Sequence, residues 1–177
     1  SSDDKTLYFT SDMPGTLGQS DLFKVSVNED GTFGKPENLG ASINTEGRET
    51  FPFISEDNEL YFASDGRPGL GGLDVFVSKI NKDGSYDEVQ NLGEPINSKQ
   101  DDFAFIINSK NRNGFFSSNR EGGHGFDDIY RFTETRRLIC EQELSGTITD
   151  AETNETLSNV NLILFDEAGK SAVEAKS

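Results

Sequence analysis

A unit of about fifty residues occurs three times in this chain and constrains the fold more than any other feature. Its clearest copy, Leu60–Ile80 (LYFASDGRPGLGGLDVFVSKI), is an alternating segment, a glycine-rich turn and a second alternating segment that opens with an acid. Leu7–Val27 (LYFTSDMPGTLGQSDLFKVSV) and Gly114–Phe132 (GFFSSNREGGHGFDDIYRF) follow the same pattern. Corresponding phenylalanines lie 53 and 54 residues apart, at Phe9, Phe62 and Phe116. A strand-rich repeat of this period is typical of β-propeller blades.

The middle copy is predicted to form four strands. Alternation of residue type predicts strands at Phe51–Ile54, Glu59–Ser64 and Asp74–Ile80, and a weaker, more polar fourth strand at Tyr86–Leu92. Asn81–Gly84 (NKDG) is the intervening turn, because Asp-Gly favours the positive φ angles of a hairpin. No helix of ordinary length is expected in the repeats. Four strands graded from a buried inner strand to a polar outer one are the construction of a propeller blade.

The segment that joins successive copies is also repeated. ENLGASIN (Glu37–Asn44) matches QNLGEPIN (Gln90–Asn97), 53 residues further along. The first copy lacks its first strand and the third copy lacks its fourth, so we expect ten strands in three incomplete blades. Closed propellers have about four to eight blades, and open blades leave sheet edges unpaired. We therefore expect further blades, and a closing strand, in sequence outside these 177 residues.

The glycine-rich turns carry the candidate site residues, to which we assign a structural role. An acid or amide just after a strand can accept hydrogen bonds from N–H groups two residues further on. The acid that opens the next strand can accept others from across the turn, and a glycine at the equivalent place suggests a positive φ angle. These residues are Asp12, Gly18 and Asp21 in the first copy, Asp65, Gly71 and Asp74 in the second, and Asn119, Gly125 and Asp128 in the third.

The pattern changes after Thr133, where a polar linker with an apolar island at Leu138–Cys140 follows. Beyond it we predict a strand, a polar turn and a second strand, at Leu144–Thr149, Asp150–Thr156 and Val160–Phe165. A Glu-Ala-Gly turn and the start of a third strand come next. The expected domains are propeller blades at 1–133, a linker at 134–143 and the truncated start of a β-sandwich at 144–177. The fold class is therefore all-β.

The net charge and the cysteine content restrict the binding partners and the disulfide bonds that we expect for this chain. The net charge of −16 repels phosphate backbones and anionic headgroups, so nucleic acid and a bare membrane surface are poor partners, and no direct membrane insertion is expected without an apolar run. The single cysteine, Cys140, excludes an intrachain disulfide framework and leaves open a bond to a cysteine elsewhere. No run of 18 apolar residues is present, and the first expected strand begins almost at once, without a signal peptide before it. Either the protein is not exported or the chain is a piece excised from a longer protein, and we favour the excised piece.

Two families resemble parts of this chain. The repeats resemble WD-like propeller repeats of the TolB type in having Ser-Asp, a glycine-rich turn and Asp-aliphatic-aromatic, here Ser64-Asp65 with Asp74-Val75-Phe76. The third copy departs by carrying Asn119 in place of the first acid. The tail, SGTITDAETNETLSNVNLILFD, resembles the opening of a carboxypeptidase-regulatory-like β-sandwich, a non-catalytic module. This order of modules is similar to OmpA-family envelope proteins of the Bacteroidetes group, one branch of which belongs to the type IX secretion system.

The sequence offers no catalytic constellation. A hydrolase needs a nucleophile, a base and an orienting group, and the one histidine, His124, lies in the third glycine-rich turn. Asp101-Asp102 and Asp127-Asp128 could bind calcium, although turn chemistry is the preferred reading and no metal or cofactor is assigned. We also assign Phe51, Phe53, Phe103 and Phe105 to the core between blades, and four loop arginines (Arg48, Arg67, Arg112 and Arg120) to ordinary surface positions.

The expected function is that of a non-catalytic scaffold or binding segment of a Gram-negative cell-envelope protein. The resemblance implies a periplasmic, outer-membrane-associated location and protein partners there, with peptidoglycan bound only through a domain outside this chain. The alternative is an accessory propeller domain that positions a polymeric substrate for a hydrolase or peptidase. An OmpA-like module in the adjoining sequence would favour the first, and a serine hydrolase fold the second.

Overall fold

The computed structural model describes residues 1, 4–138, 146–165 and 171–176. Every regular element within these ranges is a β-strand, and the all-β prediction is confirmed. The chain divides into two compact units, Ser1–Ile139 and Cys140–Ser177. Among the described residues there is no helix of the length and apolarity that crossing a membrane requires.

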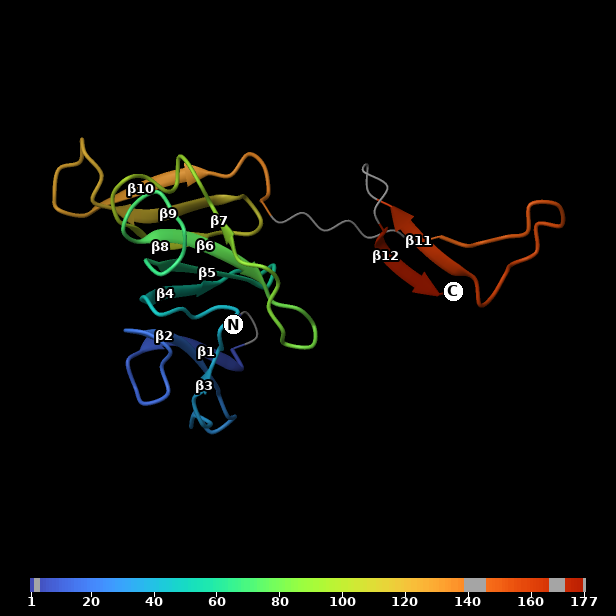
Figure 1. Ribbon diagram of the computed structural model, residues 1–177, viewed down its shortest axis with the longest axis horizontal. Helices are drawn as coiled ribbons and strands as arrows, with labels where there is room; N and C mark the ends of the chain where they lie inside the picture. Colours follow the sequence, from blue (N-terminus) through green and yellow to red (C-terminus); the bar gives the residue numbers. More distant parts are fainter. Residues whose placement is uncertain (2–3, 139–145, 166–170, 177) are drawn as a thin grey trace. The chain divides into compact units, whose positions relative to one another are not determined.

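Three antiparallel sheets make up the first unit (Figure 1). The first sheet contains β1 (Thr6–Ser11), β2 (Asp21–Ser26) and β3 (Glu37–Asn38). The second contains β4 (Glu49–Ile54), β5 (Glu59–Ser64), β6 (Asp74–Lys79) and β7 (Gln90–Asn91). The third contains β8 (Asp102–Ile107), β9 (Asn113–Ser118) and β10 (Asp128–Thr133). Neighbours in the chain are neighbours in each sheet, so every sheet is a simple meander.

The strand predictions for the middle copy are confirmed in number and order, with differences in length at three strands. β6 ends at Lys79, one residue before the predicted end. β4 begins at Glu49, two residues before the predicted start at Phe51. The fourth strand is limited to Gln90–Asn91, and Tyr86 forms only an isolated bridge with Ile80. The Ser78 hydroxyl donates to the carbonyl oxygen of Asp87 at 2.7 Å, so a side chain takes over part of the ladder here. The predicted turn is present, since the Gly84 N–H donates to Asn81 O at 2.9 Å and Gly84 has a φ angle of 83°.

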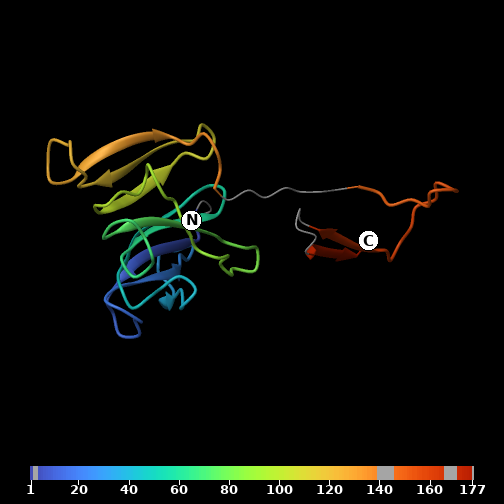
Figure 2. The same ribbon diagram turned by 45° about the horizontal axis from the view of Figure 1, so that its top comes forward.

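The three sheets lie face to face in sequence order, as both ribbon views show (Figures 1 and 2). A first core between the first and second sheets contains Leu22, Leu39, Ile43, Leu60, Phe62 and Phe76. A second core between the second and third sheets contains Tyr61, Val75, Val77, Phe105, Ile107 and Phe116. Alternation along β5 and β6 thus supplies both cores, because successive strand residues point to opposite faces. This explains why both faces of the middle sheet are buried.

The first strand of each following sheet makes the main contact with the preceding sheet. β4 packs on β1 and β2, and β8 packs on β5 and β6. Both strands contain a bulge in which one residue takes a left-handed conformation, Phe51 and Ala104, each with a φ angle of 52°. Two residues of the bulged strand then oppose one residue of its partner. The bulge is a further feature that the two copies share.

The second unit is described by itself. β11 (Asn161–Phe165) and β12 (Ser171–Lys176) form an antiparallel hairpin. The polar turn is present, with the Glu152 and Thr153 N–H groups donating to Asp150 Oδ1. The predicted strand at Leu144–Thr149 is not formed over its described part, where Thr149 makes a single bridge to Thr156. Leu144, the Glu-Ala-Gly turn and Cys140 lie outside the described residues.

Candidate functional site

The acid that opens the third strand of each repeat closes the glycine-rich turn in all three copies, as the sequence predicted. The Asp21 carboxylate accepts hydrogen bonds from the Leu17 and Gly18 N–H groups at 2.8 and 3.3 Å. The Asp74 carboxylate accepts from Leu70 and Gly71 at 2.5 and 3.4 Å, and that of Asp128 from His124 and Gly125 at 2.9 and 3.1 Å. A side chain therefore satisfies backbone donors that the turn cannot pair with a neighbouring strand.

The local bond at the start of the turn is made by serine, one residue before the predicted acid or amide. The hydroxyls of Ser11, Ser64 and Ser118 accept from the N–H two residues further on, at 3.1, 3.1 and 3.2 Å. Our assignment of this bond to Asp12, Asp65 and Asn119 is therefore wrong. A serine oxygen on the last strand residue lies within reach of that N–H, whereas the following side chain is free to point elsewhere.

Asp65 and Asn119 instead fasten the start of the first strand of their own sheet. Asp65 accepts from the Arg48 N–H at 2.6 Å and from its Nε at 2.8 Å. Asn119 Oδ1 accepts from the Asp101 N–H at 2.8 Å. Burial alone would raise the pKa of Asp65, but the hydrogen bonds from Arg48 outweigh it and lower the pKa below its usual value. Asp12 makes no comparable bond within the described residues, where β1 has no first strand beside it.

Our prediction of positive φ angles at Gly18, Gly71 and Gly125 is wrong, and at Gly18 and Gly71 glycine is required by close packing instead. A Cβ atom on Gly18 would lie 2.5 Å from the carbonyl oxygens of Thr45 and Gly47. One on Gly71 would lie 2.8 Å from the Ser98 carbonyl oxygen and closer still to that of Gln100. Backbone of the connecting segment therefore fills the space where a side chain would stand.

In each connecting segment an asparagine side chain forms hydrogen bonds to the third strand of the preceding repeat, which is β2 in the first copy and β6 in the second. Asn44 accepts from the Leu22 N–H at 2.8 Å and donates to its carbonyl oxygen at 3.0 Å. Asn97 makes the same pair of bonds to Val75, at 2.8 and 2.9 Å. Both asparagines are buried. Each side chain thus replaces a neighbouring strand at one residue of the ladder.

A buried carboxylate then begins the first strand of the next sheet. Glu49, fully buried, accepts from the Thr45 N–H at 2.8 Å and from the hydroxyls of Thr45 and Ser64 at 2.6 Å each. Asp102 holds the equivalent position and accepts from the Ser98 N–H at 2.6 Å and the Ser98 hydroxyl at 2.8 Å. Both carboxylates link the connecting segment to the sheet that follows it.

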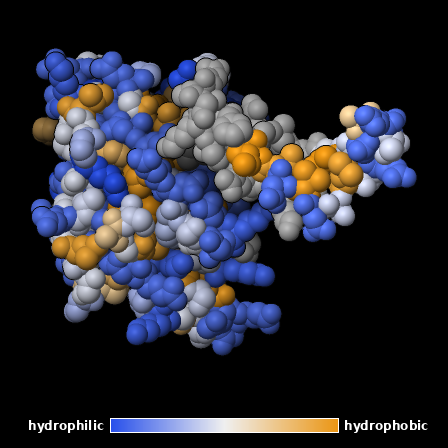
Figure 3. Space-filling model, turned by 45° about the vertical axis from the view of Figure 1, so that its right-hand side comes forward, coloured by the Kyte–Doolittle hydropathy of each residue, from blue (hydrophilic) through white to orange (hydrophobic). Residues whose placement is uncertain are grey.

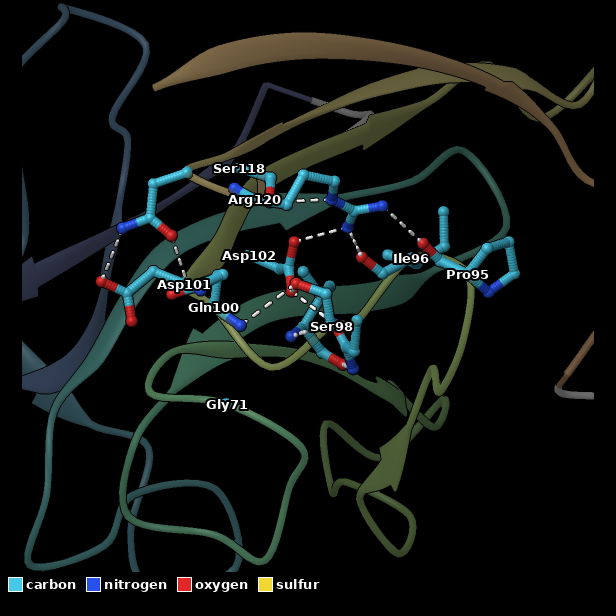
Figure 4. Close-up of polar contacts among 12 residues, drawn as sticks. Gly71, Pro95, Ile96, Ser98, Gln100, Asp101, Asp102, Ser118 and Arg120 are labelled. Carbon is cyan, nitrogen blue, oxygen red and sulfur yellow. Dashed lines mark hydrogen bonds and ion pairs between the residues drawn. The ribbon is translucent and has the colours of Figure 1, made fainter. Parts of the chain in front are cut away.

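An arginine side chain also donates hydrogen bonds to the connecting segment (Figure 4). The Arg120 guanidinium donates to the carbonyl oxygens of Pro95 and Ile96 at 2.9 and 2.6 Å and to Asp102 Oδ1 at 2.6 Å. Arg67 donates to the carbonyl oxygens of Ser42 and Ile43 at 2.8 and 2.9 Å. Burial lowers the pKa of Arg67. Arg48 is held by Asp65 and Arg112 by Asp57 at 2.9 Å, so all four loop arginines contribute to intramolecular bonds.

We call this recurring arrangement a junction. It consists of the third strand of one repeat (β2 or β6) with its turn glycine, the asparagine of the connecting segment, and the buried carboxylate that opens the next sheet. The first junction joins the first and second sheets, and the second joins the second and third. The third copy presents only its own half, because β10 pairs with β9 alone among the described residues. Ile129 occupies the place of Leu22 and Val75, which are 0% and 1% exposed, yet its own exposure is 76%. A Cβ on Gly125 would meet nothing closer than 3.4 Å.

The face of the third sheet that points away from the second sheet carries exposed hydrophobic side chains. Phe105, Phe116 and Tyr130 pack into the second core, so the residues that alternate with them point to the opposite side. Three of these residues, Ile106, Phe115 and Ile129, are exposed hydrophobics, and Ser117 and Arg131 lie opposite Ile129 and Phe115 on the same face. Isolated exposed hydrophobic residues are ordinary, but a row of them on one sheet face marks an interaction surface. Sequence reasoning did not find this face, although the equivalence of Ile129 with Val75 was visible.

A second feature lies on the bulged first strands. Phe51 stacks on Phe103 with ring centroids 5.0 Å apart, and Phe51 remains 46% exposed. The assignment of Phe51 to the core is therefore wrong, whereas Phe105 is buried as expected. The left-handed conformation of Phe51 is unfavourable for a bulky residue and is often found at functional sites.

A hollow of about 580 Å³ lies along the ends of the same strands. Its lining comes from β1, β4, β8 and β9 and includes Leu7, Phe53, Ile106 and Phe115. In the face that Figure 3 shows, hydrophobic residues lie in patches among mostly hydrophilic ones. The hollow shares Ile106 and Phe115 with the outward face of the third sheet, and concave apolar sites of this kind favour partner side chains.

Among the described residues, no group of three or more histidine, cysteine or acidic side chains is placed to hold a metal ion. One carboxylate has an unsatisfied atom, since Asp74 Oδ1 is buried without a hydrogen-bond partner. Burial raises the pKa of Asp74 above the usual value for an aspartate, and the nearby carboxylates of Asp102 and Asp101 raise it further. The site therefore disfavours a second negative charge.

Comparison of the chain with protein-family models, with curated proteins and with solved structures finds no match.

Proposed function

We propose that this chain is a non-catalytic scaffold and protein-binding segment of a bacterial cell-envelope protein. In this proposal its three sheets are consecutive blades of a β-propeller of the TolB type, followed by the start of a carboxypeptidase-regulatory-like sandwich. The proposed location is the periplasm, in association with the outer membrane. Proteins of the envelope, including those of type IX secretion, are the proposed partners.

The repeated polar residues support a structural role for the repeat. The carboxylates of Asp21, Asp74 and Asp128 all bind backbone of their own turn. The hydroxyls of Ser64 and Ser118 likewise make intramolecular bonds, although serine is a common nucleophile. A residue whose polar atoms hold a turn in several copies is better explained by the fold than by chemistry on a substrate.

The observation that carries the binding role is the stacked Phe51–Phe103 pair, in which Phe51 stays exposed. Aromatic rings provide much contact area at low entropic cost and are enriched at protein interfaces. Phe51 stands on β4, which lies between the two complete junctions, and Phe103 on β8, which the second junction holds, so little ordering is needed when a partner binds. The acidic net charge favours partners with basic surfaces.

The test compares the wild-type chain with a Phe51→Asn variant. Asparagine tolerates the left-handed conformation, so the variant is expected to fold and to keep its thermal midpoint within a few degrees. Immobilised chain is exposed separately to detergent-solubilised outer-membrane proteins and to purified peptidoglycan, and the retained proteins are identified by mass spectrometry.

The expected result is that wild-type chain retains an identified outer-membrane protein and that Phe51→Asn retains at least about tenfold less, the loss of a central aromatic anchor. Equal retention by the two chains would contradict the assignment of this surface. Hydrolysis of peptide or polysaccharide substrates by the isolated chain would contradict the scaffold role itself.

A further inference from the structure

The structure contains two complete junctions and one half of a third. In the complete junctions a segment of sequence Asn-Leu-Gly-x-x-Ile-Asn lies along the third strand, and the first strand of the next sheet then covers the apolar face. The described residues beside β10 include no such segment. We propose that the edge of β10 and the outward face of the third sheet form a docking site for an extended polypeptide segment of this same type.

We infer the hydrogen bonds of the docking site from those of the two complete junctions. The second asparagine of the segment binds both the N–H and the carbonyl oxygen of Leu22 in the first junction and of Val75 in the second. The leucine N–H of the segment also donates to the carbonyl oxygen of the same strand residue, at 3.1 Å in both junctions. Ile129 is the equivalent residue of β10. An exposed strand edge of this kind accepts a further extended segment by backbone pairing.

The apolar part of the site is equally defined. In the first junction Ile43 of the segment is fully buried in the first core. In the second junction Ile96 packs against the second core, and β8 covers Tyr61 and Val75. The corresponding residues of the third sheet, Phe115 and Ile129, are exposed. A segment that brings an isoleucine and a following apolar strand would bury them.

The space beside Gly125 is the third part of the proposed docking site. In both complete junctions the backbone after the second asparagine of the segment fills the space beside the turn glycine, so that Gly18 and Gly71 have no room for a Cβ. Gly125 has that room and still carries no side chain, although its φ angle does not require glycine. The free space at Gly125 is where the backbone of the docked segment would lie.

A second copy of this chain is not the proposed occupant. Its own two Asn-Leu-Gly-x-x-Ile-Asn segments are held inside its junctions, where Asn44 and Asn97 are buried. Within the part of the chain that the structure describes, its first sheet also has no strand equivalent to β4 or β8, the strands that make the main contact between sheets. The occupant is therefore a further polypeptide segment with the junction sequence followed by a strand that opens with an acid.

The inference deepens the proposed scaffold role by naming a partner for a surface other than the Phe51–Phe103 pair. A fluorescein-labelled peptide with the sequence of Gln90–Ile107 (QNLGEPINSKQDDFAFII) is titrated with the full chain, and binding is followed by fluorescence anisotropy. A control peptide carries the Asn97→Ala substitution. We expect saturable binding of the first peptide and at least about tenfold weaker binding of the control, because two hydrogen bonds to the strand edge are lost.

Two variants of the chain locate the site. Ile129→Asp places a charge on the apolar face, and Gly125→Ala fills the space for the segment backbone, yet both positions are open in the free chain. Each is expected to abolish peptide binding while the thermal midpoint stays unchanged. Equal binding of the two peptides, undiminished binding by both variants, no binding at all, or a homodimer that buries β10 would each overturn the inference. Retention of an envelope protein through Phe51 would survive any of these results, so the two proposals fail separately.

Discussion

Replacing Glu49 by alanine should destabilise the protein by about 3 to 5 kcal/mol, the loss typical of breaking a buried charged network. Its carboxylate is fully buried and accepts three hydrogen bonds, two from Thr45 and one from Ser64. Alanine leaves these part-buried donors without their protein partner, and each unmet buried donor costs about 1 to 3 kcal/mol. The nearby charge of Arg67 would also lose its counterpart.

Urea unfolding monitored by circular dichroism gives the free energy of unfolding for this variant. Glu46→Ala is the matched control, because Glu46 lies three residues earlier in the same segment and is exposed. The control should change the free energy of unfolding by less than about 0.5 kcal/mol. Equal, small effects at both positions would show that the Glu49 network does not hold the first junction.

Gly71→Ala is expected to cost about 3 kcal/mol, at the upper end of what overpacking normally costs. The added methyl group would meet the carbonyl oxygens of Ser98 and Gln100, which are backbone atoms of the next junction segment and cannot rotate away. Gly71 does not have a positive φ angle, so alanine adds no backbone strain and the effect reports packing alone.

Gly125→Ala is the control within the same repeat position. Its methyl group would stand in ordinary contact with Asp127, and the free energy of unfolding should stay within about 0.5 kcal/mol of wild type. Calorimetric melting of the two variants measures the contrast. A loss of similar size at Gly125 would mean that these glycines serve the turn itself and not the approach of the next sheet.

Strand positions and turn acids could be predicted because the sequence repeats them. Alternation in Glu59–Ser64 and Asp74–Ile80 predicted both strands, since one residue in two must enter each core. The acid that opens β2, β6 and β10 was assigned correctly, because a carboxylate beside unpaired N–H groups has few other uses.

The junctions were not predicted because they depend on contacts between repeats. Periodicity identifies Asn44 and Asn97 as equivalent, but not that each clamps a strand 22 residues earlier. It identifies Gly18 and Gly71 in the same way, and a glycine needed for space looks identical to one needed for a positive φ angle. Phe51 was placed in the core because alternation continues through it, whereas the bulge at that residue interrupts the alternation.

The hydrogen-bond partner of Asp65 was likewise not predictable from the sequence. Its position after the strand predicted a bond to the turn, yet its carboxylate binds Arg48 from the first strand of the same sheet. Ser64, one residue earlier, makes the local bond. Two polar residues in succession can exchange roles without any change in the sequence pattern, and only the fold decides between them.

Amide hydrogen exchange at Leu22, Val75 and Ile129 tests the central claim most directly, because these residues hold one position in three copies of the repeat. The claim is that sheets are joined by a recurring junction that is complete twice and open at the third sheet. The Leu22 and Val75 amides, which donate to buried asparagine side chains, should exchange slowly, whereas that of Ile129 should exchange quickly. Rapid exchange at Leu22 and Val75, or equal protection at all three, would contradict it.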